Sequence, residues 1–456
     1  MKKSFDIPSR SKACILTFGC QMNVHDSERM GAILEKNGFT MSEDMNHSEL
    51  IILNTCSVRE KPEEKLASFL DHIKGLKRKN PALIIAVAGC VAQQKGDQII
   101  NKFPFVDLVI GPDGIDKLLN YINDVKTKRS KIVDVDFIEE ISYSNTLMTH
   151  SGTSKSQAFV TAMKGCNNFC SYCIVPYVRG RERSRTIQEI SSDIETLVSN
   201  NVTSIMLLGQ NLARFGLENN ETLPQLLRTA GKVKGLKYLT FMTSHPRDFD
   251  DDIIKCLEEV PTLAPMLHLP AQHGSNKILK AMNRGYTREQ YLSVINKLKR
   301  SRIWEDLCIT TDVIIGFPGE DEKDYEDLMS LLKEVQYDNS FSFIYSPRPG
   351  TKAYEQYGAT LDPALRDVHV QRLMKYQELQ KEIALAKNEK LVGKTMEILV
   401  GEANPKHPNK LSGRTSGWKV VNFEASQKQT IETGNYVMVK IIKAHPTHLK
   451  GEIVND

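Results

Sequence analysis

The sequence predicts an α/β protein in three parts: an N-terminal parallel-sheet α/β domain, a partial (β/α)6 barrel and a small C-terminal β-barrel. Apolar runs alternate with amphipathic helical patterns over the first ~125 residues, which is typical of a parallel sheet. Six more apolar runs, separated by helical patterns, extend to about Leu379. From Gly393 onward the chain is β-rich and punctuated by glycines. A length of 456 residues also suits about three domains.

The first part contains three predicted strands, each a short apolar run: Cys14–Phe18, Leu50–Leu53 and Leu83–Ala88. Amphipathic patterns predict helices between or after them: Asp26–Asn37, Lys61–Arg78 and Lys117–Val125. Strands that alternate with helices favour a parallel sheet with right-handed crossovers. The polar, aperiodic stretch Lys126–Ser156 is predicted to be a linker.

The middle part contains six predicted barrel strands: Ala158–Met163, Ser204–Leu208, Tyr238–Met242, Pro265–Leu269, Cys308–Ile315 and Ser340–Tyr345. Helical patterns occupy the gaps, for instance Ile187–Ser199, Arg288–Lys299 and Asp324–Val335. A long helix, Asp362–Leu391, is expected to close this part. The tail then has three predicted strands: Thr395–Val400, Lys419–Asn422 and Tyr436–Ala444.

The composition is that of an ordinary globular protein, with 40% hydrophobic and 25% charged residues. No apolar stretch approaches the 18 or so residues of a membrane span, and the N-terminus lacks the apolar core of a signal peptide. We therefore expect a cytoplasmic protein. In that compartment the nine cysteines are expected to be metal ligands or buried thiols rather than disulfides.

Cys166, Cys170 and Cys173 form a C-x3-C-x2-C cluster directly after an apolar strand. A closed structural zinc site needs four protein ligands, and no second cysteine pair or histidine follows at the usual spacing. Three thiolates suit a 4Fe–4S cluster with one iron left open to a small molecule. The alternative interpretation is three unrelated buried thiols.

Three further cysteines, Cys20, Cys56 and Cys90, each lie just past an apolar strand of the first part. Strand ends of this kind share the carboxyl edge of a parallel sheet, where ligands bind. The pattern therefore predicts a second three-thiolate site with an open iron. The remaining cysteines lie within strand or helix patterns and are expected to be core thiols: Cys14, Cys256 and Cys308.

These motifs resemble the radical S-adenosylmethionine (SAM) methylthiotransferase family, in its tRNA-modifying branch, along essentially the whole chain. The resemblance is carried by Gly19-Cys-Gln-Met-Asn-Val-His-Asp-Ser-Glu, Asn54-Thr-Cys-Ser-Val-Arg-Glu-Lys, Cys170-Ser-Tyr-Cys-Ile-Val-Pro-Tyr-Val-Arg-Gly, Leu267-His-Leu-Pro-Ala-Gln-His-Gly-Ser and Ser342-Phe-Ile-Tyr-Ser-Pro-Arg-Pro-Gly-Thr. It implies an N-terminal methylthiotransferase domain with an auxiliary cluster at 11–127, a radical SAM core at 152–382 and an RNA-binding TRAM domain at 385–452. One departure is Leu212-Ala-Arg-Phe-Gly, where the family has a more polar run.

The resemblance implies methylthiolation of carbon 2 of isopentenyl (dimethylallyl) adenosine at position 37 of tRNAs that read codons beginning with uridine. The implied cofactors are two 4Fe–4S clusters and SAM. The Cys166/Cys170/Cys173 cluster would reduce SAM to release a 5′-deoxyadenosyl radical, and the other cluster would provide the methylthio sulfur. Three alternatives remain open: a sister enzyme acting on threonylcarbamoyladenosine, a sister acting on an aspartate of a ribosomal protein, and a non-enzymatic cluster carrier or RNA-binding protein.

SAM is expected across the carboxyl ends of the barrel strands, because barrel enzymes place their functional groups there. The predicted contacts are Gln210, Asn211, Ser244, Gln272, Ile314 and Gly316. Each could instead be an ordinary loop anchor.

The basic run that follows the cluster motif is expected to bind tRNA phosphates: Arg179, Arg181, Arg183 and Arg185. Trp418, Phe423 and Tyr436 of the tail could stack on bases or form the barrel core. The expected partners are a tRNA anticodon stem-loop, an electron donor and an iron–sulfur or sulfur donor protein. We expect no membrane and a monomer.

Overall fold

The computed structural model describes residues 11–57, 61–139, 156–358, 363–401, 410–424 and 431–454, and it omits the side chains of 61–65 and 363. The chain forms two compact units. Unit 1 comprises residues 1–151, 163–167 and 173–184, and unit 2 comprises 152–162, 168–172 and 185–456. The segment with Cys166, Cys170 and Cys173 is therefore shared between the units.

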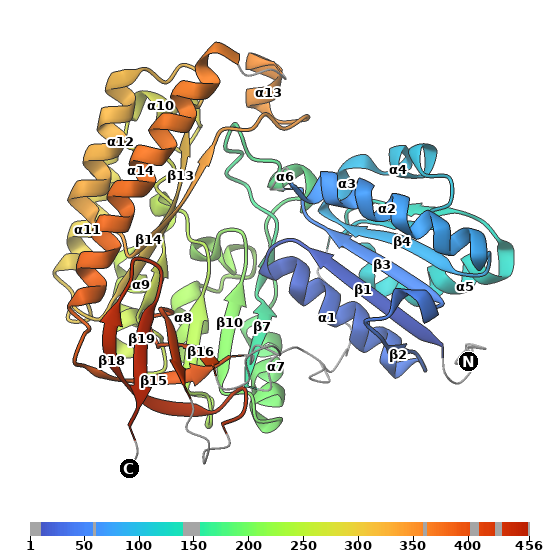
Figure 1. Cartoon of the computed structure of the whole chain (residues 1–456), viewed down its shortest axis with the longest axis horizontal. Coiled ribbons are helices and arrows are strands. Elements are labelled where there is room, and N and C mark those ends of the chain that lie inside the picture. The colour runs from blue at the N-terminus through green and yellow to red at the C-terminus, as the bar shows by residue number, and fades with distance from the viewer. Residues whose placement is uncertain are drawn as a thin grey trace. The chain divides into compact units, whose positions relative to one another are not determined.

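Unit 1 is built on a parallel sheet of six strands, in the order β2-β1-β3-β4-β5-β6 (Figure 1). The strands are β1 (Lys12–Phe18), β2 (Thr40–Met41), β3 (Leu50–Thr55), β4 (Ile84–Gly89), β5 (Leu108–Ile110) and β6 (Ile132–Asp134). The helices are α1 (Gln21–Lys36), α2 (Lys61–Lys79), α3 (Cys90–Lys95), α4 (Asp97–Lys102) and α5 (Leu118–Lys128). The predicted parallel α/β sheet is confirmed.

The sheet has a hydrophobic core on each face, because its central strands are buried on both sides. Every residue of β3 and β4 is buried. Helices α1 and α5 cover one face through side chains such as Leu34 and Ile122. Helices α2, α3 and α4 cover the other through side chains such as Leu70, Val91 and Ile99. Continuous apolar strands of this kind are typical of parallel sheets.

Two boundaries in unit 1 differ from the sequence prediction by more than two residues. Helix α1 begins at Gln21 rather than Asp26, directly after Cys20, whose backbone N–H donates to Asn23 Oδ1 at 3.4 Å. The predicted linker was wrong at its start, because α5 continues to Lys128 and β6 follows at Ile132–Asp134. A three-residue strand is too short to show a periodic pattern. Residues 135–139 contain no helix or strand, and residues 140–155 lie outside the described residues.

Unit 2 contains the six parallel strands of the predicted partial barrel. They are β7 (Gln157–Thr161), β10 (Ser204–Leu208), β11 (Tyr238–Phe241), β12 (Met266–His268), β13 (Cys308–Ile315) and β14 (Asn339–Ile344). They form two three-stranded sheets, β7-β10-β11 and β12-β13-β14. A parallel bridge from Leu239 to Leu263 connects β11 to the segment that leads into β12. The (β/α)6 prediction is confirmed.

Helices follow the barrel strands along the chain: α7 (Ile187–Ser199), α8 (Leu223–Ala230), α9 (Asp251–Glu259), α10 (Asn276–Ala281), α11 (Arg288–Lys299), α12 (Glu322–Val335) and α13 (Lys352–Tyr357). Threonine N-caps with a Glu or Gln three residues later fix the start of three of them: Thr186, Thr222 and Thr287. Between β7 and α7, the short helix α6 (Val175–Val178) and a small hairpin, β8 (Met163–Lys164) with β9 (Arg183–Ser184), belong to unit 1.

The tail forms a closed five-stranded barrel, β15-β16-β17-β19-β18. Its strands are β15 (Thr395–Val400), β16 (Lys410–Arg414), β17 (Val420–Glu424), β18 (Tyr436–Ala444) and β19 (Leu449–Ile453). Its core includes Ile398, Val421, Phe423 and Val439. The predicted small β-barrel is confirmed, although β16 and β19 were not predicted from the sequence.

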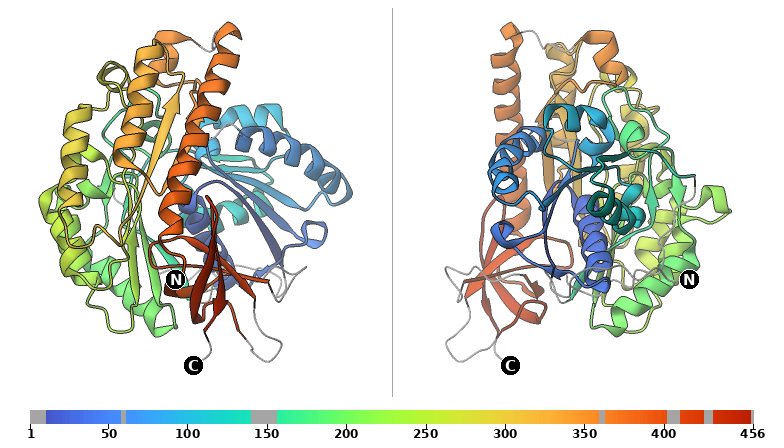
Figure 2. Two further views of the ribbon diagram at one scale, coloured as in Figure 1. Left: turned by 60° about the vertical axis from the view of Figure 1, so that its left-hand side comes forward. Right: turned by 90° about the vertical axis from the view of Figure 1, so that its right-hand side faces the viewer.

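Helix α14 (Pro363–Glu389) runs along β14 and leads to the small barrel (Figure 2). Asp338, just before β14, pairs with Lys387 near the end of α14 at 2.5 Å and with Lys419, just before β17, at 2.7 Å. Glu397 of β15 accepts hydrogen bonds from Lys237 and Tyr238, beside and within β11. These polar contacts attach the small barrel to the amino-terminal ends of the barrel strands. None of the described helices is long and apolar enough to cross a membrane.

Candidate active site

Three cysteines of unit 1 lie at the carboxyl edge of its parallel sheet. Cys20 follows β1 by two residues, Cys56 directly follows β3, and Cys90 directly follows β4 as the first residue of α3. Because β1, β3 and β4 are neighbours in the sheet, the three thiols lie on adjacent strand ends. The sequence placed them at this edge correctly. Their role as cluster ligands stays a prediction.

Two glycines allow the chain to pass close to these thiols. A Cβ at Gly19 would lie 2.8 Å from Cys56 Cβ, which is closer than real contacts allow. Gly89 has φ +89, and a Cβ there would lie 2.4 Å from the carbonyl oxygen of Thr55. The hydrogen bond with Cys56, opposed by burial and assisted by Arg179, lowers the pKa of the Cys20 thiol to about 6. The site therefore favours a thiolate at Cys20, the form that binds metals.

Arg179 is a buried cation at this cysteine site. Its Nε–H donates to Cys90 Sγ at 3.2 Å, and its Nη1 pairs with Asp26 Oδ2 at 2.8 Å. The two side chains are 3% and 1% exposed. Burial raises the pKa of the Cys90 thiol, and the charge of Arg179 opposes this effect. The sequence did not reveal this role, because no spacing relates Asp26 to Arg179.

The other arginines of the basic run differ in their surroundings. Arg183 pairs with buried Asp113 at 2.8 Å, and Arg185 pairs with Asp193 of α7 at 2.7 Å. Arg181 is exposed. The ion pairs give Arg179 and Arg183 a structural role that the sequence analysis did not foresee. Phosphate contact stays a prediction, and exposure favours Arg181 for it.

The segment after Cys173 is anchored to the N-terminal sheet domain within unit 1. Ile174 and Val178 pack with Cys90 in a small apolar cluster. Lys164 lies 3.3 Å from Asp113, the residue that also holds Arg183. This segment therefore begins at a cysteine of the C-x3-C-x2-C motif and supports the Cys20/Cys56/Cys90 site.

The cysteines of the C-x3-C-x2-C motif have different local surroundings. The Cys166 backbone N–H donates to the Gly180 carbonyl at 3.1 Å in unit 1. In unit 2, buried Cys170 accepts a hydrogen bond at Sγ from Arg284 Nη1 at 3.2 Å. Arg284 also donates to the Pro270 carbonyl and to Tyr286 Oη. A cation again faces a sulfur, which suits an anionic cluster ligand.

One thiol of each cysteine set accepts a hydrogen bond from a buried arginine. The described residues hold no group of three or more His, Cys, Asp or Glu side chains gathered around one metal position. Donors to sulfur, Arg179 at Cys90 and Arg284 at Cys170, are groups that tune such clusters.

The residues predicted to contact SAM lie at the carboxyl ends of the barrel strands. Asn211 is buried, donates to Asp248 at 2.7 Å and accepts the His245 backbone N–H at 2.9 Å, so its amide is used within the protein. Ser244 is 1% exposed, and its Oγ has no hydrogen-bond partner among the described residues. Gln210 lies beside Asn211 at the end of β10. Contact with SAM stays a prediction for all of them.

Backbone strain marks the ends of two barrel strands. Thr243, after β11, has φ +67, and Gln272, after β12, has φ +65. A positive φ is unfavourable for a β-branched residue and is held by its surroundings, often at functional sites. The Gln272 carbonyl accepts the Ile314 N–H at 2.9 Å, and a Cβ at Gly316 (φ +73) would lie 2.6 Å from the His369 ring. Gln272, Ile314 and Gly316 therefore lie at the same edge of the barrel.

His245 is a buried residue at this edge that the sequence analysis missed. Its Nε2 has no hydrogen-bond partner among the described residues, while Nδ1 accepts the Arg247 N–H at 3.3 Å. Burial, with the charges of Arg284 and Arg247, lowers its pKa to about 2. His245 therefore stays neutral. Its position directly after Ser244, a predicted SAM contact, could have identified it from the sequence.

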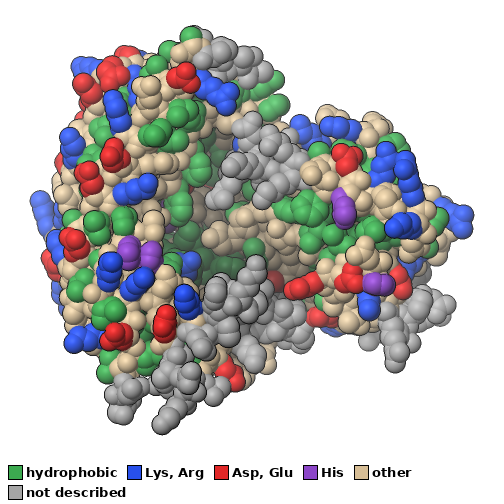
Figure 3. All heavy atoms as spheres, in the orientation of Figure 1, with side chains coloured by type: hydrophobic (Ala, Val, Ile, Leu, Met, Phe, Trp, Pro, Cys, Tyr) green, Lys and Arg blue, Asp and Glu red, His purple; other side chains and the backbone are tan. Residues whose placement is uncertain are grey.

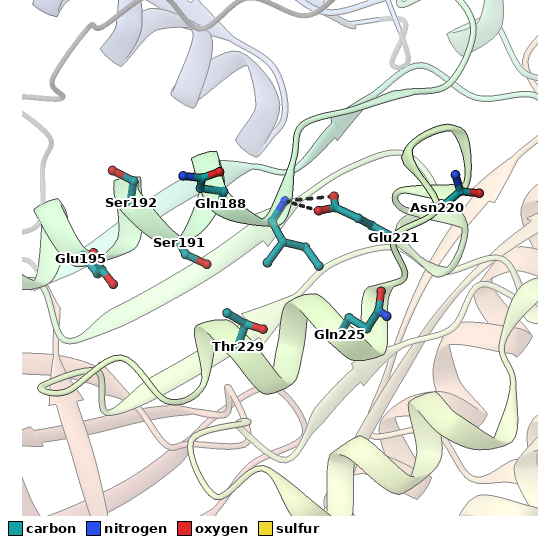
Figure 4. Close-up of a pocket in the computed structure, with 9 residues that line it drawn as sticks. Gln188, Ser191, Ser192, Glu195, Asn220, Glu221, Gln225 and Thr229 are labelled. Carbon is teal, nitrogen blue, oxygen red and sulfur yellow. Dashed lines mark hydrogen bonds between the residues drawn. The ribbon is translucent and has the colours of Figure 1, made fainter.

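Figure 4 shows a pocket between α7 and α8. Its lining is polar, and Glu221 accepts the Ile187 N–H there. It contains none of the predicted site residues. Figure 3 shows basic and acidic side chains interspersed over the viewed face of the protein, which agrees with a net charge of only +4. Charge therefore marks no site on this face.

Comparisons with known proteins agree with this arrangement. Residues 12–111 match the uncharacterized protein family UPF0004, residues 160–332 match the radical SAM superfamily, and residues 389–454 match the TRAM domain. In fold, the chain resembles the radical S-adenosylmethionine methyltransferase TsrM from Kitasatospora setae, with a TM-score of 0.56 and 14% identity over 78% of this chain and 76% of that one. The fold and the cysteine motif define a radical SAM protein.

Full-length relatives narrow this class. A tRNA-2-methylthio-N(6)-dimethylallyladenosine synthase from Clostridium botulinum (strain Langeland) is 45% identical over 98% of both chains. The enzyme of that name from Trichlorobacter lovleyi is 42% identical over 98% of this chain and all of its own. This chain belongs to the tRNA-2-methylthio-N(6)-dimethylallyladenosine synthase family.

Proposed function

We propose that this chain uses SAM to methylthiolate carbon 2 of dimethylallyladenosine at position 37 of tRNA. The observation that carries the proposal is its 42–46% identity, over nearly the full length, to relatives named for that product. The barrel, the C-x3-C-x2-C motif and the tail barrel supply the parts that such a reaction needs. The tRNAs would be those that read codons beginning with uridine.

Each cysteine set has a separate role in this proposal. Cys166, Cys170 and Cys173 would hold the 4Fe–4S cluster of the radical SAM core, and Cys20, Cys56 and Cys90 would hold an auxiliary 4Fe–4S cluster. When bound, the clusters and SAM would supply the electron, the radical and the methylthio group, since carbon 2 of adenine carries a C–H bond that acid–base chemistry does not activate.

The surrounding residues orient and insulate these groups. Arg179, fixed by Asp26, supports Cys90, and Arg284, fixed by the Pro270 carbonyl, supports Cys170. Ser244 and His245 present buried polar atoms at the strand ends where SAM is expected. A buried group without a partner in the protein is costly unless a ligand completes it.

The tRNA would present its base from the anticodon loop, where a nucleotide can be splayed out without breaking a helix. Exposed Arg181 is the best placed of the basic run for a phosphate contact. Of the tail aromatics, Phe423 lies in the barrel core, and Tyr436 hydrogen-bonds to Thr203. Neither is arranged as a stacking platform.

The experiment is an anaerobic assay of the reconstituted enzyme with SAM and a strong reductant. Three tRNA substrates are compared, carrying dimethylallyladenosine, threonylcarbamoyladenosine or unmodified adenosine at position 37. We expect the methylthio product from the first alone. Equal turnover of the threonylcarbamoylated tRNA would place the chain with the sister enzyme.

A further inference from the structure

Two phenylalanines of β14 are unusually exposed for residues in a barrel strand. Phe341 and Phe343 are 44% and 43% exposed, and they alternate with half-buried Ser340, Ser342 and Ile344. Adjacent large apolar side chains left open to solvent often mark a binding surface. Their spacing of two puts both on the same face of the strand.

Hydrogen bonds identify that face. Ser340 and Ser342 contact Tyr376 and Gln377 of α14, so the serine face of β14 is turned toward the outer helix. The phenylalanines therefore point to the inner, concave face of the barrel. The Phe341 ring also meets the His268 ring of β12 edge-on, with centroids 6.2 Å apart, across the intervening strand β13.

The strand register extends this apolar wall toward the predicted SAM site. Asp312 and Ile314 of β13 lie opposite Phe341 and Phe343. Ile314 is one of the predicted SAM contacts and is followed by the strand end at Gly316. The aromatic pair thus lies on the same concave face as the chemistry, beside the strand end.

The charges near the wall discriminate between possible occupants. Strands β12, β13 and β14 contain no lysine or arginine. Asp312, 32% exposed, adds a carboxylate that lies 3.3 Å from His268. A carboxylate on the ligand would meet an apolar surface and a like charge, which is unfavourable. A neutral, branched hydrocarbon group would lose no hydrogen bond there.

We propose that Phe341 and Phe343 form the wall that binds the dimethylallyl substituent of the substrate adenosine and excludes threonylcarbamoyl. This inference rests on the proposed function and names the residues that select its substrate. Removal of the aromatic rings should reduce the preference for the modified base and leave SAM binding intact.

The test compares two anticodon stem-loop RNAs that differ only in the dimethylallyl group at position 37. Equilibrium binding and steady-state kinetics are measured for the reconstituted wild-type enzyme and for Phe341→Ala, Phe343→Ala and Phe343→Leu. Met374→Ala serves as the control. Met374 lies on α14 and is 64% exposed, so this substitution removes an exposed apolar side chain away from β14. SAM binding is measured in parallel.

In each alanine variant the preference for the dimethylallyl RNA over the unmodified RNA should fall about tenfold, mostly because the KM for the dimethylallyl RNA rises. Phe343→Leu should retain most of it, and Met374→Ala all of it. An unchanged preference in both alanine variants would overturn the inference, as would a loss of SAM affinity with the RNA preference intact. Absence of methylthiolation by the wild type would instead reject the proposed function.

Discussion

Arg179 shows how a single residue can serve a cysteine site from a distant part of the sequence. Its guanidinium is held by Asp26 and donates to Cys90 Sγ. The six cysteines could be selected from the sequence because their spacing and strand context are local features. The partners of Arg179 and Arg183 could not, because buried ion pairs depend on tertiary contacts that leave no pattern in the sequence.

Replacement of Arg179 should change the electronic properties of an auxiliary cluster. The Cys170→Ala background is chosen to remove the signal of the other predicted cluster. In that background Arg179→Gln should lower the reduction midpoint potential by about 60 mV, a tenfold change for one electron. The reason is that a nearby positive charge stabilises the more negative reduced form. Redox titration followed by electron paramagnetic resonance measures the shift.

Two controls separate this effect from damage to the fold. Arg179→Lys keeps the charge but loses the forked geometry and should shift the potential less. Arg181→Gln changes an exposed arginine of the same segment and should leave the potential unchanged. Equal shifts of the midpoint potential in all three variants would show that Arg179 has no specific effect on the cluster.

Cys170→Ala should abolish formation of 5′-deoxyadenosine from SAM, because the radical SAM cluster would lose a ligand and SAM its electron source. Chromatography of the anaerobic reaction under strong reductant measures this product. Cys256→Ala is the matched control, since Cys256 is a buried thiol of α9 and hydrogen-bonds only weakly to the Pro224 carbonyl. Deoxyadenosine from Cys170→Ala would show that Cys170 is not a ligand.

At the level of elements, long periodic segments agreed well with the sequence prediction. Helices α7 and α11 and strands β10, β13 and β15 have the predicted bounds. The short strands β5, β6, β16 and β19 were missed, because three to five residues give too little pattern to distinguish a strand from a loop. The position of a residue relative to a strand end still predicted the cysteine site, since Cys20, Cys56 and Cys90 follow neighbouring strands.

The sheet edge of unit 1 should hold its cluster independently of the radical SAM motif. The reconstituted wild type should contain about eight irons in two 4Fe–4S clusters. The combined Cys20→Ala, Cys56→Ala and Cys90→Ala variant should contain about four, still cleave SAM to deoxyadenosine and lose methylthiolation. Iron analysis and product chromatography measure the three quantities. Methylthiolation by this variant would leave the auxiliary cluster without a required role.

Asp338 should be the main polar anchor between α14, the tail barrel and β14. Its side chain is 4% exposed and pairs with Lys387 and Lys419. Asp338→Ala would remove the buried carboxylate that both lysines share and that accepts the Ile309 N–H. The change should cost about 3 kcal/mol and lower the midpoint of thermal unfolding by several degrees. Differential scanning calorimetry measures the unfolding midpoint.

Asp252→Ala is the control for this change. Asp252 pairs with Arg228 at 2.6 Å but is half exposed, and such a pair contributes about 0–1 kcal/mol. Similar midpoints for the two variants would contradict the anchoring role of Asp338.

At the scale of the whole molecule, three parts are combined in one chain: a parallel sheet with three cysteines at its edge, a six-stranded barrel with the C-x3-C-x2-C motif, and a closed β-barrel. The segment 173–184 starts at a cysteine of the C-x3-C-x2-C motif and carries the arginine that donates to Cys90. The order of these parts was evident from the sequence. The substrate wall on β14 was not, since the exposure of Phe341 and Phe343 follows only from the barrel.

The central claim is the identity of the modified nucleoside, and nucleoside analysis of tRNA from a deletion strain tests it most directly. Mass spectrometry of digested tRNA should show loss of 2-methylthio-dimethylallyladenosine and accumulation of dimethylallyladenosine. The native gene should restore the product, and the Cys170→Ala gene should not. An unchanged level of 2-methylthio-dimethylallyladenosine, with loss of the methylthio group from threonylcarbamoyladenosine or from a ribosomal aspartate, would contradict the account.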